Sequence, residues 1–222
     1  MENRIDKIEV VDKSIVTLSE LIERSRDIES RCDDYMVTKS STAMNFRYNT
    51  NGCFEFTDSN TGEFKEMRAS DWAKSQIGIR LNIPAGYIDK CEEAGFNDLA
   101  VQNMNTWIDK YNKSFFIRAY EDHIRGFLSP RYTACDTSKV LTTLGDVVNP
   151  NDYKIKGSFI NEERTHIRLI GTEKLHINNE DLFPALFFDT SDVGRKTLII
   201  RFGIYKLVCT NGMVVAKAGG IM

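Results

Sequence analysis

The 222-residue sequence has no long apolar run and no large excess of either charge. Its longest stretches without a charged side chain are ten residues, Leu99–Ile108 and Leu207–Ala216, whereas a membrane-spanning helix needs about 20 apolar residues. The 29 basic and 32 acidic residues give a formal charge of −3, which excludes a strongly basic chain. No basic leader followed by an apolar stretch opens the sequence. We therefore expect a cytoplasmic protein (in the host cell, if phage-encoded) without a membrane partner.

Motifs of known catalytic classes are also missing. The sequence contains no Walker loop, GxGxxG, HExxH or GxSxG. The three histidines, His123, His166 and His176, lie 43 and then ten residues apart, which matches no familiar metal-ligand spacing. The five cysteines are odd in number and form no CxxC pair, which favours free thiols in a reducing compartment. We predict no catalytic residues, no metal site and no cofactor.

Two weaker chemical alternatives stay open. Asp189 and Asp192 flank a predicted turn and could hold a metal ion in a nuclease, although aspartate is equally expected there as a turn residue. Cys135 and Cys209 could act as nucleophiles only with a partnering histidine, and none is adjacent in sequence.

Acidic residues are concentrated near the N-terminus. Residues 1–36 contain ten acidic and six basic side chains, whereas residues 37–222 contain 22 acidic and 23 basic ones. Thr17 and Glu20 match a capping box before helical spacing, which predicts a helix over 18–34. We therefore divide the chain into an acidic helical segment, 1–36, and a single α+β domain, 37–222. The acidic face is either simply solvated or docks a partner or another copy.

The order of predicted elements indicates the fold class. Asn49–Gly52 is predicted to turn between two strands, and Ser70 is predicted to cap the first of three helices before residue 111. Strand patterns dominate from residue 113, interrupted by a short helix that begins near Asp136 and runs to Val147. We predict an α+β fold with a mostly antiparallel, curved sheet, helices packed on one side and an N-terminal helix.

Strands of the second half interleave basic and aromatic residues. Because side chains alternate between the two faces of a strand, several rows emerge: Phe116 with Arg118 and Tyr120; Arg125 with Phe127; Arg164 with His166 and Arg168; Arg201 with Tyr205. Such rows suit single-stranded nucleic acid, whose bases stack on aromatic rings for about 1–3 kcal/mol each while cations neutralise phosphates. The simpler alternative is the solvent face of an antiparallel sheet, which carries the same residue types.

Two segments resemble a known family. They are Arg118–Tyr132 (RAYEDHIRGFLSPRY) and Ile204–Met213 (IYKLVCTNGM). Over residues 115–222 they resemble the phage- and plasmid-borne family called domain of unknown function 932. The positions that carry the resemblance are Arg118, Ser129, Arg131, Tyr132, Asp136, Lys206, Cys209, Asn211 and Gly212. The family has no agreed activity, and its mobile-element setting implies recombination or conflict with host defence. The order of elements is also similar to phage annealing proteins of the Redβ and Erf kind, which form rings or filaments on single-stranded DNA.

These observations together predict a phage-type protein that binds single-stranded DNA, promotes annealing and recombination, and forms a homo-oligomer. The residues predicted to contact DNA are Arg118, Tyr120, Arg125, Arg131, Tyr132, Arg168, Arg201 and Lys206. The alternative, motivated by the acidic segment, is a mobile-element protein that binds, blocks or is sensed by a host defence complex.

Overall fold

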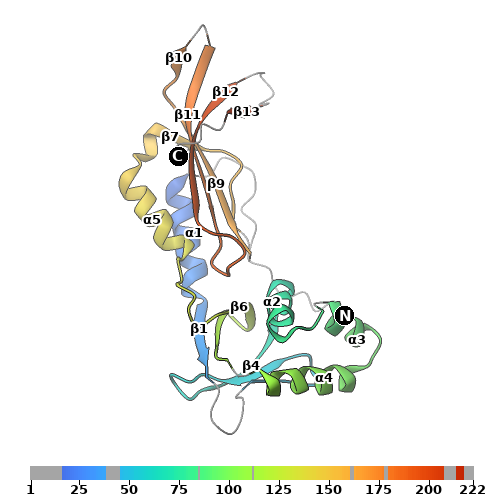
Figure 1. Ribbon diagram of the computed structural model, residues 1–222. Coiled ribbons are helices and arrows are strands. Elements are labelled where there is room, and N and C mark those ends of the chain that lie inside the picture. The colour runs from blue at the N-terminus through green and yellow to red at the C-terminus, as the bar shows by residue number, and fades with distance from the viewer. Residues whose placement is uncertain are drawn as a thin grey trace. The chain divides into compact units, whose positions relative to one another are not determined.

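The chain divides into two compact units (Figure 1). The computed structural model describes residues 17–38, 46–84, 86–111, 113–160, 163–177, 180–207 and 214–217. Among the described residues, the first unit lies within 31–133 and the second comprises 17–30 and those from 134 to 217. The acidic N-terminal helix therefore belongs to the same unit as the C-terminal strands.

The first unit combines a six-stranded sheet with three helices among its described residues. The strand order is β1-β5-β6-β4-β3-β2, and every pair is antiparallel except β4 with β6. The strands are β1 (Cys32–Val37), β2 (Phe46–Tyr48), β3 (Phe54–Thr57), β4 (Phe64–Ala69), β5 (Phe115–Tyr120) and β6 (His123–Leu128), and the helices are α2 (Asp71–Leu81), α3 (Gly86–Glu93) and α4 (Asn97–Lys110).

Local sequence signals set the turns and caps of this unit. The Asn49 side-chain oxygen accepts hydrogen bonds from the Asn51 and Cys53 N–H groups, both at 3.0 Å, and thereby shapes the β2–β3 turn. Gly52 closes that turn at φ +75°, a conformation that favours glycine. Ser70 accepts a hydrogen bond from the Ala73 N–H at 3.2 Å, so it caps α2. The predicted hairpin turn and helix cap are confirmed.

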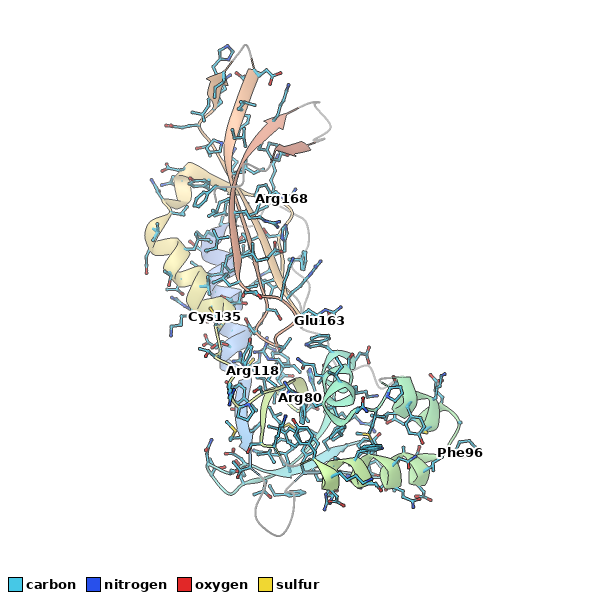
Figure 2. All side chains as sticks on the ribbon, viewed as in Figure 1. Arg80, Phe96, Arg118, Cys135, Glu163 and Arg168 are labelled. Carbon is cyan, nitrogen blue, oxygen red and sulfur yellow. The ribbon has the colours of Figure 1, made fainter. Side chains whose placement is uncertain are left out.

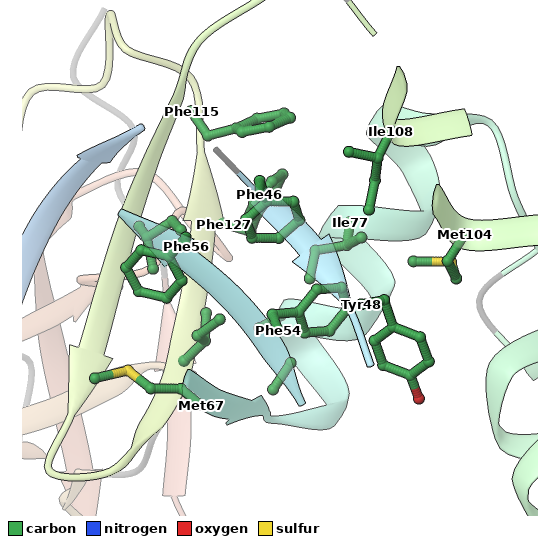
Figure 3. Close-up of a cluster of buried hydrophobic side chains, with 14 of the residues drawn as sticks. Phe46, Tyr48, Phe54, Phe56, Met67, Ile77, Met104, Ile108, Phe115 and Phe127 are labelled. Atoms are coloured by element: carbon green, nitrogen blue, oxygen red, sulfur yellow. The ribbon is translucent and has the colours of Figure 1, made fainter. Parts of the chain in front are cut away.

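Aromatic side chains fill the core of the first unit (Figure 3). Phe46 lies at its centre, with ring centroids 5.2 Å from Phe54 and 5.3 Å from both Phe115 and Phe127. Ile77 of α2 and Met104 of α4 belong to the same buried cluster. The helices thus cover the sheet through a shared apolar layer, whose burial stabilises the unit.

The second unit packs two helices on one face of a seven-stranded sheet, again counted over the described residues. The main order is β13-β12-β11-β9-β7, while β10 pairs with β11 and β8 pairs with β9, all antiparallel. The strands are β7 (Tyr153–Ile155), β8 (Phe159–Ile160), β9 (Thr165–Gly171), β10 (Leu175–Ile177), β11 (Glu180–Thr190), β12 (Ile199–Leu207) and β13 (Val214–Lys217). The helices are α1 (Leu18–Ser30) and α5 (Thr137–Val147), which lie side by side in Figure 1, and a short 3-10 turn (Pro150–Asp152) precedes β7.

Alternation along the strands separates the two faces of this sheet. Ile167 and Leu169 of β9, with Leu186 and Phe188 of β11, form a buried cluster with residues of α1 and α5. The neighbouring positions, such as Arg168 and Phe187, therefore point to the opposite face. The helix α1 begins as predicted, because Thr17 N–H donates to Glu20 and Glu20 N–H donates back to the Thr17 hydroxyl.

The predicted fold class, α+β with mostly antiparallel pairing and an N-terminal helix, is confirmed. Two details differ. There are two sheets in two units where one sheet was predicted, and the units do not separate at residue 36. The helix predicted over 18–34 ends at Ser30, and Cys32–Val37 forms β1. The pairing of β1 with β5 explains the difference, because a strand partner 80 residues away overrides local helical spacing.

Candidate nucleic-acid interface

The eight predicted DNA contacts fall into both units. Five lie in the first unit and three in the second. The first group is Arg118, Tyr120, Arg125, Arg131 and Tyr132, and the second is Arg168, Arg201 and Lys206. Each group is therefore considered within its own unit.

The strand residues of the first group are buried. Arg118 is 3% exposed, and its Nε donates to the Asp34 carboxylate at 2.8 Å. Tyr120 is equally buried and lies under the Arg31 guanidinium, whose carbon is 4.9 Å from the ring centre. Arg125 of β6 is buried too. The solvent-exposed row expected along 114–120 is therefore wrong, because β1 brings Asp34 opposite Arg118 and pairs the charge inside the unit.

Arg131 and Tyr132 lie in the loop after β6. The Tyr132 N–H donates to the Ser129 carbonyl at 2.9 Å, and the Arg131 N–H donates to the Ser129 hydroxyl at 3.2 Å. The Tyr132 ring stacks on Phe116 with centroids 6.3 Å apart. The Ser129-x-x-Tyr132 pattern thus forms a turn held by its serine, and Arg131 is left exposed.

The second group includes two residues on what we call the basic face, the face of the second unit's sheet opposite α1 and α5. Arg168 of β9 is paired in register with Phe187 of β11, which is paired in turn with Arg201 of β12. Figure 2 labels Arg168 within this sheet. The third residue, Lys206, is paired in register with Leu182 and bonds to Glu180, so it lies on the face of β12 opposite to Arg201.

Cations lie over aromatic rings on the basic face. The Arg168 guanidinium carbon is 5.6 Å from the centre of the Phe187 ring, and that of Arg164 is 4.9 Å from the centre of Phe159. The Phe159 and His166 rings are 5.6 Å apart and tilted by 30°. Phe159 and Phe187 are half-buried, so each ring has an edge or face at the surface. The buried Arg168 Nε has no hydrogen-bond partner among the described residues.

Asp189 organises the cations at one end of this face. Its carboxylate accepts from His166 Nδ1 at 2.8 Å and from Arg201 at 2.9 Å, and Lys196 Nζ is 3.5 Å away. Its side chain is 5% exposed. Burial by itself would raise the pKa of the Asp189 carboxyl, but the hydrogen bond from His166 and the charges of His166 and Lys196 outweigh it and hold that pKa below its usual value. Asp189 is therefore ionised at neutral pH.

Positive charge exceeds negative charge on the basic face. Exposed Lys154 of β7 belongs to it, because Lys154 is paired with Ile170, whose neighbours Leu169 and Gly171 lie toward the helices. The cations are Lys154, Arg164, Arg168, Lys196 and Arg201. The carboxylates that β11 places on this face are Asp189 and, eight residues away, Asp181, which pairs with Lys174 and His176. The face is locally positive although the whole chain carries a formal charge of −3.

Sequence reasoning missed Phe159 and Phe187 on this face, and it considered Asp189 only as a possible metal ligand or turn residue. Phe159, Phe187 and Asp189 come from strands whose pairing partners are not visible in the sequence. The alternation of Arg164, His166 and Arg168 was the signal that pointed to this face. Only the register of β11 against β9 places Phe187 beside Arg168.

Asp192, the second aspartate of the predicted metal alternative, holds the start of a helix. Asp192 accepts from the Thr137 N–H at 3.0 Å and from its hydroxyl at 2.7 Å, at the start of α5. Within the described ranges, no three His, Cys, Asp or Glu side chains lie close enough together to hold a metal ion. Cys135 is free and half-buried, while Cys209, Asn211 and Gly212 lie outside the described residues.

A small polar cavity of about 170 Å³ lies in the first unit beside the β2–β3 turn. Its groups bond mainly to one another: the Tyr48 hydroxyl donates to Glu92, and Arg68 donates to the Asn51 carbonyl at 2.7 Å. Burial, assisted by the bond to Glu92, raises the pKa of the Tyr48 hydroxyl. We assign this cavity to the network that fastens the turn to α3.

The helix α1, which belongs to the acidic segment, forms one side of the second unit's helical layer. Leu18 and Leu21 of α1 lie in the buried cluster, and Glu29 bonds to the Ser138 hydroxyl of α5. Glu20, Glu23 and Asp27 are exposed. Among the described helices, none has the length and apolar composition that crossing a membrane requires.

Residues 125–221 match the model of the family described as Domain of unknown function (DUF932). The match confirms the resemblance found in the sequence, and it includes the strands of the basic face. No curated protein and no solved structure matches the chain. The similarity to the Redβ and Erf annealing proteins therefore stays a prediction.

Proposed function

We propose that this chain, which carries a segment of the DUF932 family over residues 125–221, binds single-stranded DNA on the basic face of its second unit. The observation that carries the proposal is the pair of cation–aromatic contacts, Arg168 over Phe187 and Arg164 over Phe159, on one locally positive face. Annealing of complementary strands, in a phage or other mobile element, is the activity that this binding would serve.

The chemistry favours a single strand over a duplex. Unpaired bases present their flat faces to aromatic rings, and each stacked base contributes about 1–3 kcal/mol. In a duplex those faces are covered by neighbouring base pairs. Lys154, Arg168 and Arg201 come from three strands of the sheet, so they can follow a phosphate backbone that crosses it.

The test is fluorescence anisotropy with a labelled single-stranded oligonucleotide at low and moderate salt, with the same sequence as a duplex for comparison. We expect tighter, salt-sensitive binding to the single strand. The variant Lys154→Ala should weaken it and reduce the salt slope by about 0.7, the value for one phosphate contact on a single strand. The matched control is Lys139→Ala, because Lys139 is exposed on α5 on the other side of the sheet.

Two outcomes would contradict the proposal. The first is an absence of binding at low salt. The second is an equal loss in Lys154→Ala and Lys139→Ala, which would show a general charge effect instead of a site. Annealing itself is measured by energy transfer between two complementary labelled strands, and we expect the protein to accelerate their pairing.

Self-association is a further part of the proposal. Ile200, Phe202 and Ile204 form an exposed apolar row on the face of β12 opposite to Arg201, and Phe202 lies beside a groove that includes Val148 and Pro184. An exposed ring next to an apolar groove can be exchanged reciprocally between two copies related by a twofold axis. We expect Phe202→Ser to lower the mass measured by light scattering, and an unchanged mass would remove this contact from the proposal.

A further inference from the structure

His166 has a fixed orientation on the basic face. Its Nδ1 lies 2.8 Å from an Asp189 oxygen, and a carboxylate oxygen can only accept, so the ring proton is on Nδ1. The other ring nitrogen, Nε2, makes no hydrogen bond to a described residue. The side chain is 18% exposed. When the ring is neutral, Nε2 therefore carries a lone pair and can only accept a hydrogen bond. When the ring is protonated, Nε2 carries a hydrogen and can donate one.

Charged groups approach His166 along the chain around β9 and from β11, β12 and the segment between them. Arg164 and Arg168 lie on either side of it along the chain, and Phe159 of β8 is opposite it in register. From β11 comes Asp189, whose second oxygen bonds to Arg201 of β12. Lys196 approaches the same carboxylate from the segment between β11 and β12. Asp189 contributes a negative charge beside the ring and the four cations contribute positive charges around it, and a docked phosphate would add a further negative charge.

We infer that His166 is a proton-dependent phosphate contact of the DNA strand, which engages a phosphodiester oxygen through Nε2–H only when the imidazole is protonated. The inference rests on the proposed function. It adds that a phosphate group of the DNA strand binds at His166. Phe159 and Phe187 supply the stacking surfaces for bases, and His166 lies between them in the row of β9. The neutral ring would present a lone pair to an oxygen that also carries lone pairs, so no bond forms.

Linkage makes the consequence measurable. If the phosphate binds only the protonated ring, strand binding takes up a proton wherever the free ring is neutral. Histidine is the side chain whose charge ordinarily changes between pH 5 and 8. A single charge-assisted hydrogen bond of this kind is expected to change affinity by about tenfold across that range.

The probe is a labelled single-stranded thymidine oligonucleotide, because thymine keeps its charge between pH 5.5 and 8. We expect the wild-type affinity at fixed ionic strength to rise about tenfold from pH 8 to pH 5.5. In His166→Gln that rise should disappear. The matched control is His176→Gln. His176 pairs with Asp181 at 3.0 Å. Asp181 is eight residues before Asp189 on β11, which places the two carboxylates about 27 Å apart. The His176→Gln variant should therefore keep the wild-type pH profile.

A second measurement needs no variant. Calorimetry of the wild-type protein with the same oligonucleotide at pH 7, in buffers of different ionisation enthalpy, reports the protons taken up on binding. We expect a fractional uptake. Zero uptake, or a wild-type pH profile in folded His166→Gln, would overturn the inference and leave the proposed function intact. An absence of binding at every pH would instead overturn the proposed function.

Discussion

Replacing Asp189 with asparagine is expected to destabilise the second unit by about 1–3 kcal/mol. The carboxylate accepts from His166 at 2.8 Å and from Arg201 at 2.9 Å, and a hydrogen bond to a charged group contributes about 1.5–3 kcal/mol. An asparagine side chain has one oxygen that can still accept a hydrogen bond. Its amide NH2 group would replace the other oxygen and face either His166 or the Arg201 guanidinium, from which it cannot accept a hydrogen bond. The loss of unfolding free energy stays below the summed contributions of the two hydrogen bonds. The Arg201 side chain is 57% exposed, so water can solvate its guanidinium when the bond to Asp189 is lost.

The measurement is urea unfolding of wild type and Asp189→Asn over a range of pH. Because the folded protein lowers the pKa of Asp189, the stabilisation that this causes is present above the unfolded pKa of about 3.9 and is lost as the pH falls through the folded pKa. The difference between the two proteins should therefore be present at pH 7 and shrink as the pH falls below about 4. Equal unfolding midpoints at pH 7, or a difference that grows as the pH falls below about 4, would refute the reasoning.

Three further substitutions test the first unit by urea unfolding. Arg118→Ala should cost about 2–3 kcal/mol, because it removes a charged bond to Asp34 and leaves space inside the unit; an unchanged midpoint with weaker DNA binding would restore Arg118 as a DNA contact. Gly52→Ala should cost at least about 1 kcal/mol, since φ is +75° and the added carbon would lie 3.1 Å from a Glu92 oxygen; a neutral effect would show that the turn adjusts. Ser70→Ala should cost about 1 kcal/mol, and no change would mean that the cap of α2 is dispensable.

Part of the candidate site could be predicted from the sequence. Arg168 and Arg201 follow from alternation, because any strand displays every second side chain on the same face. Phe187 and Asp189 could not be predicted, since their positions beside Arg168 and His166 depend on the register of β11 against β9. A shift of one residue would have sent both side chains to the helical face.

Arg118 shows how the same reasoning fails. Alternation correctly placed Arg118 and Tyr120 together, but it carries no information on whether that face is covered. The ion pair with Asp34 depends on β1, and the local pattern of residues 18–34 favoured a helix there. A charged residue within a strand indicates solvent only when no partner of opposite charge lies opposite it.

The caps at Thr17 and Ser70, the turn at Asn49, the α+β class and the family resemblance could all be predicted from the sequence. The caps and the turn depend on neighbours within a few residues, and the class and the resemblance depend on the order of residues along the chain. The division into two units, and the face in the second unit where cations lie over aromatic rings, depend on tertiary pairing. Strand pairing joins residues far apart in the chain, and the free energy that selects the register comes from burial of whole faces.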